Sequence, residues 1–291
     1  MITLPLEVES VELIILCENT TFRSNIYGDA GLAILINATL SNGDTIKILF
    51  DTGENEEVFI HNIEVLNVDL SDLDVIVISH GHHDHTGGLI RALDMVNRRI
   101  PIILHPDALL PKFALKPKLR YTGIPFDPSE IERRGILLFS RRPINLSDSI
   151  IVSGEIPRKT DYEKVENYYI LRQDRLEKDY MLDDQALFFI FADNSIGIIT
   201  GCSHSGIINI TNYSQEITQK RSVKFIIGGF HLINASDKRI EKTWEDLSKI
   251  DPAYLSPMHC SGVKIISKIL QNNPKKYLAI HAGDRILFKT T

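Results

Sequence analysis

The chain has 291 residues, of which 43% are hydrophobic and 24% charged, a composition typical of a globular protein with a sizeable core. Its formal net charge of −6 argues against general nucleic-acid binding, and no apolar run approaches the ~20 residues needed to span a bilayer. Cys17, Cys202 and Cys260 are too few for a disulfide framework, and the N-terminus is not signal-like, so we expect a cytoplasmic protein without a membrane partner.

In the first half of the chain, apolar runs predict short strands, at residues 13–16, 33–37, 46–50, 74–79 and 102–104. The segment 41–44 reads as a hairpin-type turn between two of them. Asn55 is expected to be the N-cap of a helix that runs to about Asn67, with Glu56 and Glu57 in its first turn. A second helix is expected from Leu89.

The middle of the chain has a different character. Residues 106–135 mix proline, basic and aromatic residues, and residues 157–184 are dense in charge. Neither segment shows a clean strand pattern, and long irregular segments in compact enzymes are usually lids or substrate walls. We therefore interpret both as insertions near the site within a single domain spanning 1–291. Solvated surface loops are the alternative.

The second half resumes the regular pattern of strands and helices. Strands are expected at residues 186–191, 196–200, 223–227, 253–255 and 286–288, and helices at about 207–218, 237–250 and 263–270. Strand hairpins therefore mix with strand–loop–helix units along the chain. This mixture predicts an α/β fold of two sheets with helices outside them, and not one parallel sheet.

The run His80-Gly81-His82-His83-Asp84-His85 places potential metal ligands directly after a predicted buried strand. A strand end is a rigid place from which to aim imidazoles at one point. Zinc and its first-row neighbours favour imidazole nitrogen and carboxylate oxygen. A solvated histidine-rich loop is the alternative interpretation of the run.

Further histidines follow other predicted strands, namely His105, His204, His231 and His259. One histidine at a strand end is more often structural than a ligand. Because strand ends share an edge in open sheets, however, several of them can converge on one centre. His80 and His82 point the same way on an extended segment and can share one metal, whereas Asp84 and His85 lie past the turn and can face a second. Asp51, at another strand end, suits an orienting role beside a ligand, although a simple turn aspartate is the alternative.

Several motifs together resemble the metallo-β-lactamase superfamily, namely Phe50-Asp51-Thr52-Gly53, residues 80–85, Gly201-Cys202-Ser203-His204 and Pro257-Met258-His259. The resemblance covers nearly the whole chain. It implies an αββα sandwich of two mixed sheets with outer helices and the metal site at one sheet edge. The superfamily includes hydrolases, nucleases and oxidoreductases, so the motif is specific for the fold and poorly specific for the reaction.

Other segments resemble one branch of that superfamily, namely residues 27–32, 79–82, 154–158, 183–187, 201–206, 227–232 and 259–262. Members of this branch are dihydropterin–ribofuranosylaminobenzene phosphate synthases, which join a pterin methyl diphosphate to an arylamine ribose phosphate and release pyrophosphate. The resemblance implies small phosphorylated substrates and one or two divalent metal ions, Zn²⁺ first, with Mg²⁺, Mn²⁺ or Fe²⁺ as alternatives.

The resemblance also assigns ligands. It implies a first site of His80, His82 and His204, and a second site of Asp84, His85 and His259. Hydrolytic relatives usually carry a bridging aspartate where this chain has Cys202, which either ligates a metal as thiolate or packs. Asp184, which precedes the strand where those relatives have a histidine ligand, is a further candidate.

Several residues are expected to act on the substrate. Asp84 and His231 are the candidates for catalysis, and a buried structural histidine is the alternative reading of His231. Arg158 is expected to contact phosphate, while Tyr27 and Phe230 can stack on a flat ring, although core packing explains the aromatics equally well. The alternative function is a hydrolase that uses metal-bound hydroxide on a phosphodiester, lactone or cyclic nucleotide. A non-catalytic metal-binding protein is the least favoured, and the sequence does not indicate an oligomeric state.

Overall fold

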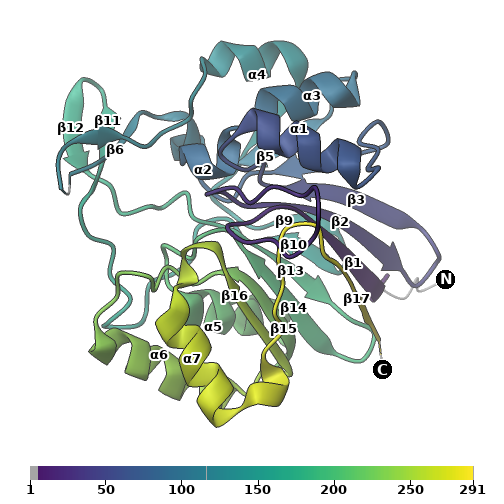
Figure 1. Ribbon diagram of the computed structural model, residues 1–291, viewed down its shortest axis with the longest axis vertical. Helices are drawn as coiled ribbons and strands as arrows, with labels where there is room; N and C mark the ends of the chain where they lie inside the picture. The colour runs from purple at the N-terminus through teal and green to yellow at the C-terminus, as the bar shows by residue number, and fades with distance from the viewer. Residues whose placement is uncertain (1–5, 116, 291) are drawn as a thin grey trace.

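Two large sheets pack face to face in the computed structural model, which describes residues 6–115 and 117–290, and helices cover both outer faces (Figure 1). The first sheet has the order β17-β1-β2-β3-β4-β5-β8. Its strands are β1 (Val8–Cys17), β2 (Ala33–Leu40), β3 (Thr45–Phe50), β4 (Val75–Val77), β5 (Pro101–Leu104), β8 (Ile136–Phe139) and β17 (Arg285–Lys289). The antiparallel pairing of β1 with β17 places strands from the two ends of the chain side by side.

The second sheet has the order β16-β15-β14-β13-β10-β9. Its strands are β9 (Ile144–Ser147), β10 (Ile150–Val152), β13 (Ala186–Ile190), β14 (Ser195–Thr200), β15 (Ser222–Gly229) and β16 (Tyr254–Met258). Helices α1 (Glu56–Val65), α3 (Leu89–Val96) and α4 (Pro128–Arg134) lie over the first sheet, and α5 (Ile207–Thr218), α6 (Asp237–Ile250) and α7 (Val263–Asn272) over the second (Figure 1).

The side chains of a strand alternate between two cores, and this alternation explains the four layers of helices, sheet, sheet and helices. In β1, Leu13 and Ile15 belong to the core between the two sheets, whereas Ile14 and Leu16 pack in the core beneath α1 and α3. Successive side chains of a strand point to opposite faces, so a strand buried on both faces reads as a continuous apolar run. A third core lies between the second sheet and its helices. The expected αββα architecture is confirmed.

The two middle segments, residues 106–135 and 157–184, contain regular strands, whereas the sequence predicted irregular insertions. β6 (Lys112–Ala114), β7 (Arg120–Tyr121), β11 (Tyr168–Arg172) and β12 (Arg175–Lys178) form a small sheet of order β12-β11-β6-β7. In Figure 1 this sheet projects beyond the main layers. Strands β8, β9 and β10 and helix α4 were not predicted either. The short strands of the small sheet come from two separate segments, and neither segment carries a clear alternation of its own.

Parallel strands set the position of the site. In the first sheet β3, β4 and β5 run parallel, and in the second sheet β14, β15 and β16 do the same. Carboxyl ends of parallel strands meet at one edge. The segments that follow these strands carry nearly all the predicted site residues. Within the described ranges, no helix combines the length and apolar character needed to cross a membrane.

Candidate metal centre

The loop after β4 is held in place by Asp51, which follows β3. The Asp51 carboxylate accepts hydrogen bonds from the Ser79 amide and the Ser79 hydroxyl, each at 2.7 Å. Gly81 then passes so close to the Ala108 backbone that a Cβ at this position would lie 1.9 Å from the Ala108 oxygen. A glycine between His80 and His82 therefore allows the loop to pack directly against the backbone of Ala108.

His80, His82 and His204 form the first group of donor atoms, with one ligand atom of each within 4.8 Å of the others. All three side chains are buried, and burial lowers the pKa of each imidazole, that of His82 to about 3. Neutral imidazole is the form that binds metals. Nε2 of His82 and both ring nitrogens of His204 are buried without a hydrogen-bond partner, which is costly unless a ligand occupies them.

Asp84, His85, Cys202 and His259 form the second group, with the same spacing between ligand atoms. Nε2 of His85 lies 3.2 Å from Sγ of Cys202, and Nε2 of His259 lies 3.4 Å from Oδ2 of Asp84. The backbone amide of His259 donates to Glu18. Oxygen, nitrogen and sulfur donors therefore converge at this point, a set that suits zinc.

Charges in the second group balance one another. Burial opposes ionisation of Asp84, but His85 and His259 outweigh it and hold the pKa of its carboxyl well below the usual range. Burial also opposes protonation of His259, yet Cys260 and Asp84 raise the pKa of this imidazole to about 9. The group without a metal therefore holds a proton that a cation must displace.

Cys202 connects the two groups, because it also forms a third donor set with His204 and His231. Its Sγ lies 3.3 Å from Sγ of Cys260, and burial raises the pKa of the Cys202 thiol well above its usual range. Both donor groups lie at one edge of the two sheets, as the sequence predicts. The orphaned buried nitrogens and the mixed donor set fit one or two divalent metal ions.

Asp184 lies close to the site but supports it from outside. Its carboxylate accepts hydrogen bonds from the backbone amides of His204 and Ser205 and from the Ser205 hydroxyl, and it belongs to none of the three donor sets among the described residues. The structure therefore assigns Asp184 to shaping the loop that carries His204, and not to ligating a metal as the sequence suggested.

The three residues expected to bind substrate lie elsewhere. Both terminal nitrogens of Arg158 donate to backbone oxygens, those of His204 and Met181, and so brace the loop, while its Nε is buried without a hydrogen-bond partner. Phe230 is fully buried in the core beneath α5 and α6. Tyr27 stacks on His61 at 4.0 Å and does not line the cavity beside the centre. Their apolar or cationic character alone could not distinguish these positions from a substrate contact.

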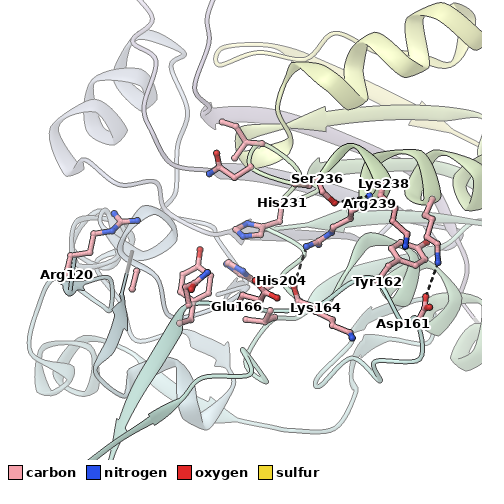
Figure 2. A pocket seen from close by; sticks show the side chains of 18 residues that line it. Arg120, Asp161, Tyr162, Lys164, Glu166, His204, His231, Ser236, Lys238 and Arg239 are labelled. Atoms are coloured by element: carbon pink, nitrogen blue, oxygen red, sulfur yellow. Dashed lines mark hydrogen bonds and ion pairs between the residues drawn. The ribbon is translucent and has the colours of Figure 1, made fainter. Parts of the chain in front are cut away.

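A cavity of about 780 Å³ opens beside the centre, and His204 and His231 form part of its wall (Figure 2). Tyr168 of β11 also lines it, with its ring 5.2 Å from the rings of both His82 and His204. Sequence reasoning missed Tyr168 because β11 itself was missed. The β-prone run 168–172 before the two-residue turn Gln173–Asp174 is the signal that could have found it.

Comparisons with known proteins find relatives of this chain. The model of the metallo-β-lactamase superfamily matches residues 28–160. A 7,8-dihydropterin-6-methyl-4-(β-D-ribofuranosyl)-aminobenzene-5′-phosphate synthase of Methanocaldococcus jannaschii is 32% identical over 97% of this chain and 98% of its own. An uncharacterised protein of the same organism is 34% identical over 89% of this chain and 94% of its own.

A solved structure is also similar to this chain. It is described as a metal-dependent hydrolase of the β-lactamase superfamily, is 26% identical, and superposes with a TM-score of 0.82 over 96% of this chain and 100% of its own.

Proposed function

Since this chain belongs to the metallo-β-lactamase superfamily, we propose that it is a metal-dependent synthase that couples a pterin methyl diphosphate to an arylamine ribose phosphate. The similarity to the named synthase over nearly the full length of both chains supports this choice. The observation that supports it most is the cavity beside the donor groups, whose wall combines histidines, two tyrosine rings and several cations. Phosphorylated, flat reactants match that lining.

The metal ligands are proposed as two sets. His80, His82 and His204 would hold one divalent ion, and Asp84, His85, Cys202 and His259 a second. When bound, such ions supply Lewis-acid chemistry to the diphosphate of the leaving group. Asp84 contributes a carboxylate that its neighbours keep ionised.

The coupling forms a bond between the amine nitrogen and the pterin methylene carbon, while the bond from that carbon to the diphosphate oxygen breaks and a proton leaves the nitrogen. His231 faces the cavity, its ring lies 4.2 Å from that of His204, and its Nδ1 has no hydrogen-bond partner. We assign His231 to receive this proton. Tyr168 offers its ring as a wall against which a flat reactant can lie.

Direct assay of both products tests the proposal. The full-length protein with Zn²⁺ is incubated with the pterin methyl diphosphate and the arylamine ribose phosphate, and pyrophosphate and the coupled product are measured. We expect both, with strong loss in His82→Ala and in His231→Gln. His61→Ala serves as a matched control because His61 lies outside all the donor sets. Absence of both products with every divalent metal tried would refute the synthase.

The alternative is a metal-dependent hydrolase of a phosphodiester, lactone or cyclic nucleotide. The description of the solved relative at 26% identity favours it. Turnover of bis(p-nitrophenyl) phosphate, abolished by chelator and by His82→Ala, in a protein that forms no coupled product would establish this second reading. A synthase should release pyrophosphate only when the amine is present.

A further inference from the structure

The cavity beside the metal centre is basic. Cationic side chains that line it are Arg120, Lys164, Lys238, Arg239 and Lys242, whereas the acidic ones are Asp161 and Glu166. The chain as a whole has a net charge of −6, so this concentration of positive charge runs against its overall balance. A cleft lined by one sign of charge attracts ligands of the opposite sign.

Most of these cations have no acidic partner. Lys242 lies 3.4 Å from the Asp161 carboxylate, but no carboxylate of the described part of the chain is within ion-pair distance of Lys164, Lys238 or Arg239. Nε of Arg239 is buried without a hydrogen-bond partner, and one terminal nitrogen donates only a long bond, 3.3 Å, to the Lys164 backbone oxygen. Burial lowers the pKa of Arg239 although the nearby Glu163 carboxyl opposes the shift, so its guanidinium is partly desolvated and only partly compensated. Burying a charged group in this way costs free energy unless an anion accepts its hydrogen bonds.

The cations lie at a distance from the metal donors. In Figure 2, His204 and His231 lie in the middle of the cavity, with Arg239, Lys238 and Lys164 to one side and Arg120 to the other. The reacting bond and the cationic end of the cavity are therefore separate places on one continuous surface.

We propose that Lys164, Lys238 and Arg239 form a subsite for a terminal phosphate monoester, carried by a substrate whose reacting end lies at His204 and His231. We call these three residues the Arg239 subsite. The inference rests on the proposed function in that it concerns the same cavity, and it specifies that one reactant carries a phosphate remote from the bond that changes. A phosphate dianion matches the subsite better than a single carboxylate, because three cations line the same side of the cavity (Figure 2).

A binding measurement with the full-length, metal-loaded protein tests the subsite. Isothermal titration calorimetry compares ribose 5-phosphate with ribose, in wild-type protein and in Lys164→Ala, Lys238→Ala and Arg239→Gln. We expect ribose 5-phosphate to bind, ribose to bind far more weakly, and each substitution to weaken the phosphorylated sugar about tenfold, the usual scale of a charge-assisted hydrogen bond. Affinity should also fall as salt rises.

Matched variants distinguish binding at the subsite from a general effect of the net charge of the protein. Lys249→Ala removes a lysine from the last turn of the same helix α6, outside the cavity, and should leave binding unchanged. Arg239→Lys should recover part of the affinity lost in Arg239→Gln. Equal binding of ribose 5-phosphate by wild-type protein and all three subsite variants would overturn the proposal, because the phosphate would then bind at the metals.

The outcome is independent of the coupling assay. If the subsite variants weaken ribose 5-phosphate but no coupled product ever forms, the subsite stands and the synthase assignment fails. If coupling proceeds and the subsite variants leave the KM for the arylamine ribose phosphate unchanged, the subsite fails and the synthase assignment stands. When both are right, the variants raise that KM with little change in kcat.

Discussion

Asp51 and His85 are joined by a buried hydrogen bond in which Nδ1 of the imidazole lies 2.7 Å from Oδ2 of the carboxylate. Both side chains are fully buried. The bond fixes the orientation of the ring and leaves Nε2, 3.2 Å from the Cys202 sulfur, facing the donor group. An orienting carboxylate of this kind usually tunes the affinity of a metal ligand. The role expected for Asp51 from the sequence therefore has a clear geometric basis.

The first prediction concerns this bond. Asp51→Asn should lower the affinity of the second ion by roughly 10- to 100-fold, since the amide cannot replace the charge that holds His85 in its ligating orientation. Competition with a chromophoric chelator measures the change. Asp251→Asn is a matched control, because Asp51 and Asp251 both have φ of 57° and asparagine tolerates that conformation. An unchanged affinity in Asp51→Asn would show that Asp51 does not orient a metal ligand.

The second prediction concerns Cys202. Cys202→Ser should lower the bound Zn²⁺ from two ions to one, because the second group loses its only sulfur donor. Elemental analysis of the purified variants provides the count. Cys260→Ser should keep both ions, since Cys260 contacts the Cys202 thiol but belongs to no donor set of the described residues. Two ions in Cys202→Ser would show that this thiol only packs.

The third prediction concerns pH. An ion in the second group must displace the proton of His259, whose pKa is raised to about 9, so its affinity should rise as pH increases from 6 to 8. The imidazoles of the first group have lowered pKa values and are already neutral in that range, so an ion there should release no proton.

Single-group variants separate these two effects. His204→Ala retains the second group and His259→Ala retains the first. Calorimetry in buffers of different ionisation enthalpy counts the protons released per Zn²⁺. We expect at least one proton for His204→Ala and none for His259→Ala. Equal proton release, or a pH-independent affinity in both, would contradict the assignment.

The fourth prediction concerns Lys112, which links the small sheet to residues 80–85, here called the histidine loop. Its ammonium is buried and donates to Asp179 at 2.7 Å and to Asp183 at 2.9 Å, while Asp183 also accepts from the Gly81 amide at 2.8 Å. Lys112→Met leaves buried carboxylates uncompensated and should lower the free energy of unfolding by ~3–5 kcal/mol.

Chemical denaturation measures this loss. Lys264→Met breaks an ion pair in which the lysine is 59% and Asp237 84% exposed, and it should cost less than about 1 kcal/mol. A similar small loss in Lys112→Met would show that the buried pair does not stabilise the fold.

The sequence predicted those parts of the fold whose apolar pattern is local. Helices α5 and α6 begin and end where expected, and Asn55 caps α1 by accepting hydrogen bonds from the amides of Glu57 and Val58. The histidine loop was recognisable because its ligands lie next to one another in the chain, directly after a buried strand.

Features that combine distant segments of the chain could not be predicted from local sequence patterns. Lys112 looks like a surface lysine until β6 pairs with β11 and brings it against Asp183. Phe230 follows a glycine pair and resembles a substrate contact, but the direction of the chain after β15 turns its ring into the core. The Arg239 subsite combines α6 with the segment before β11, a juxtaposition that no local pattern encodes.

Anomalous diffraction from crystals of the zinc-loaded protein, collected on both sides of the zinc edge, tests the metal centre most directly. We expect one peak among His80, His82 and His204 and a second among Asp84, His85, Cys202 and His259. A zinc-loaded crystal with no anomalous peak at either group, or with its peak elsewhere, would contradict it.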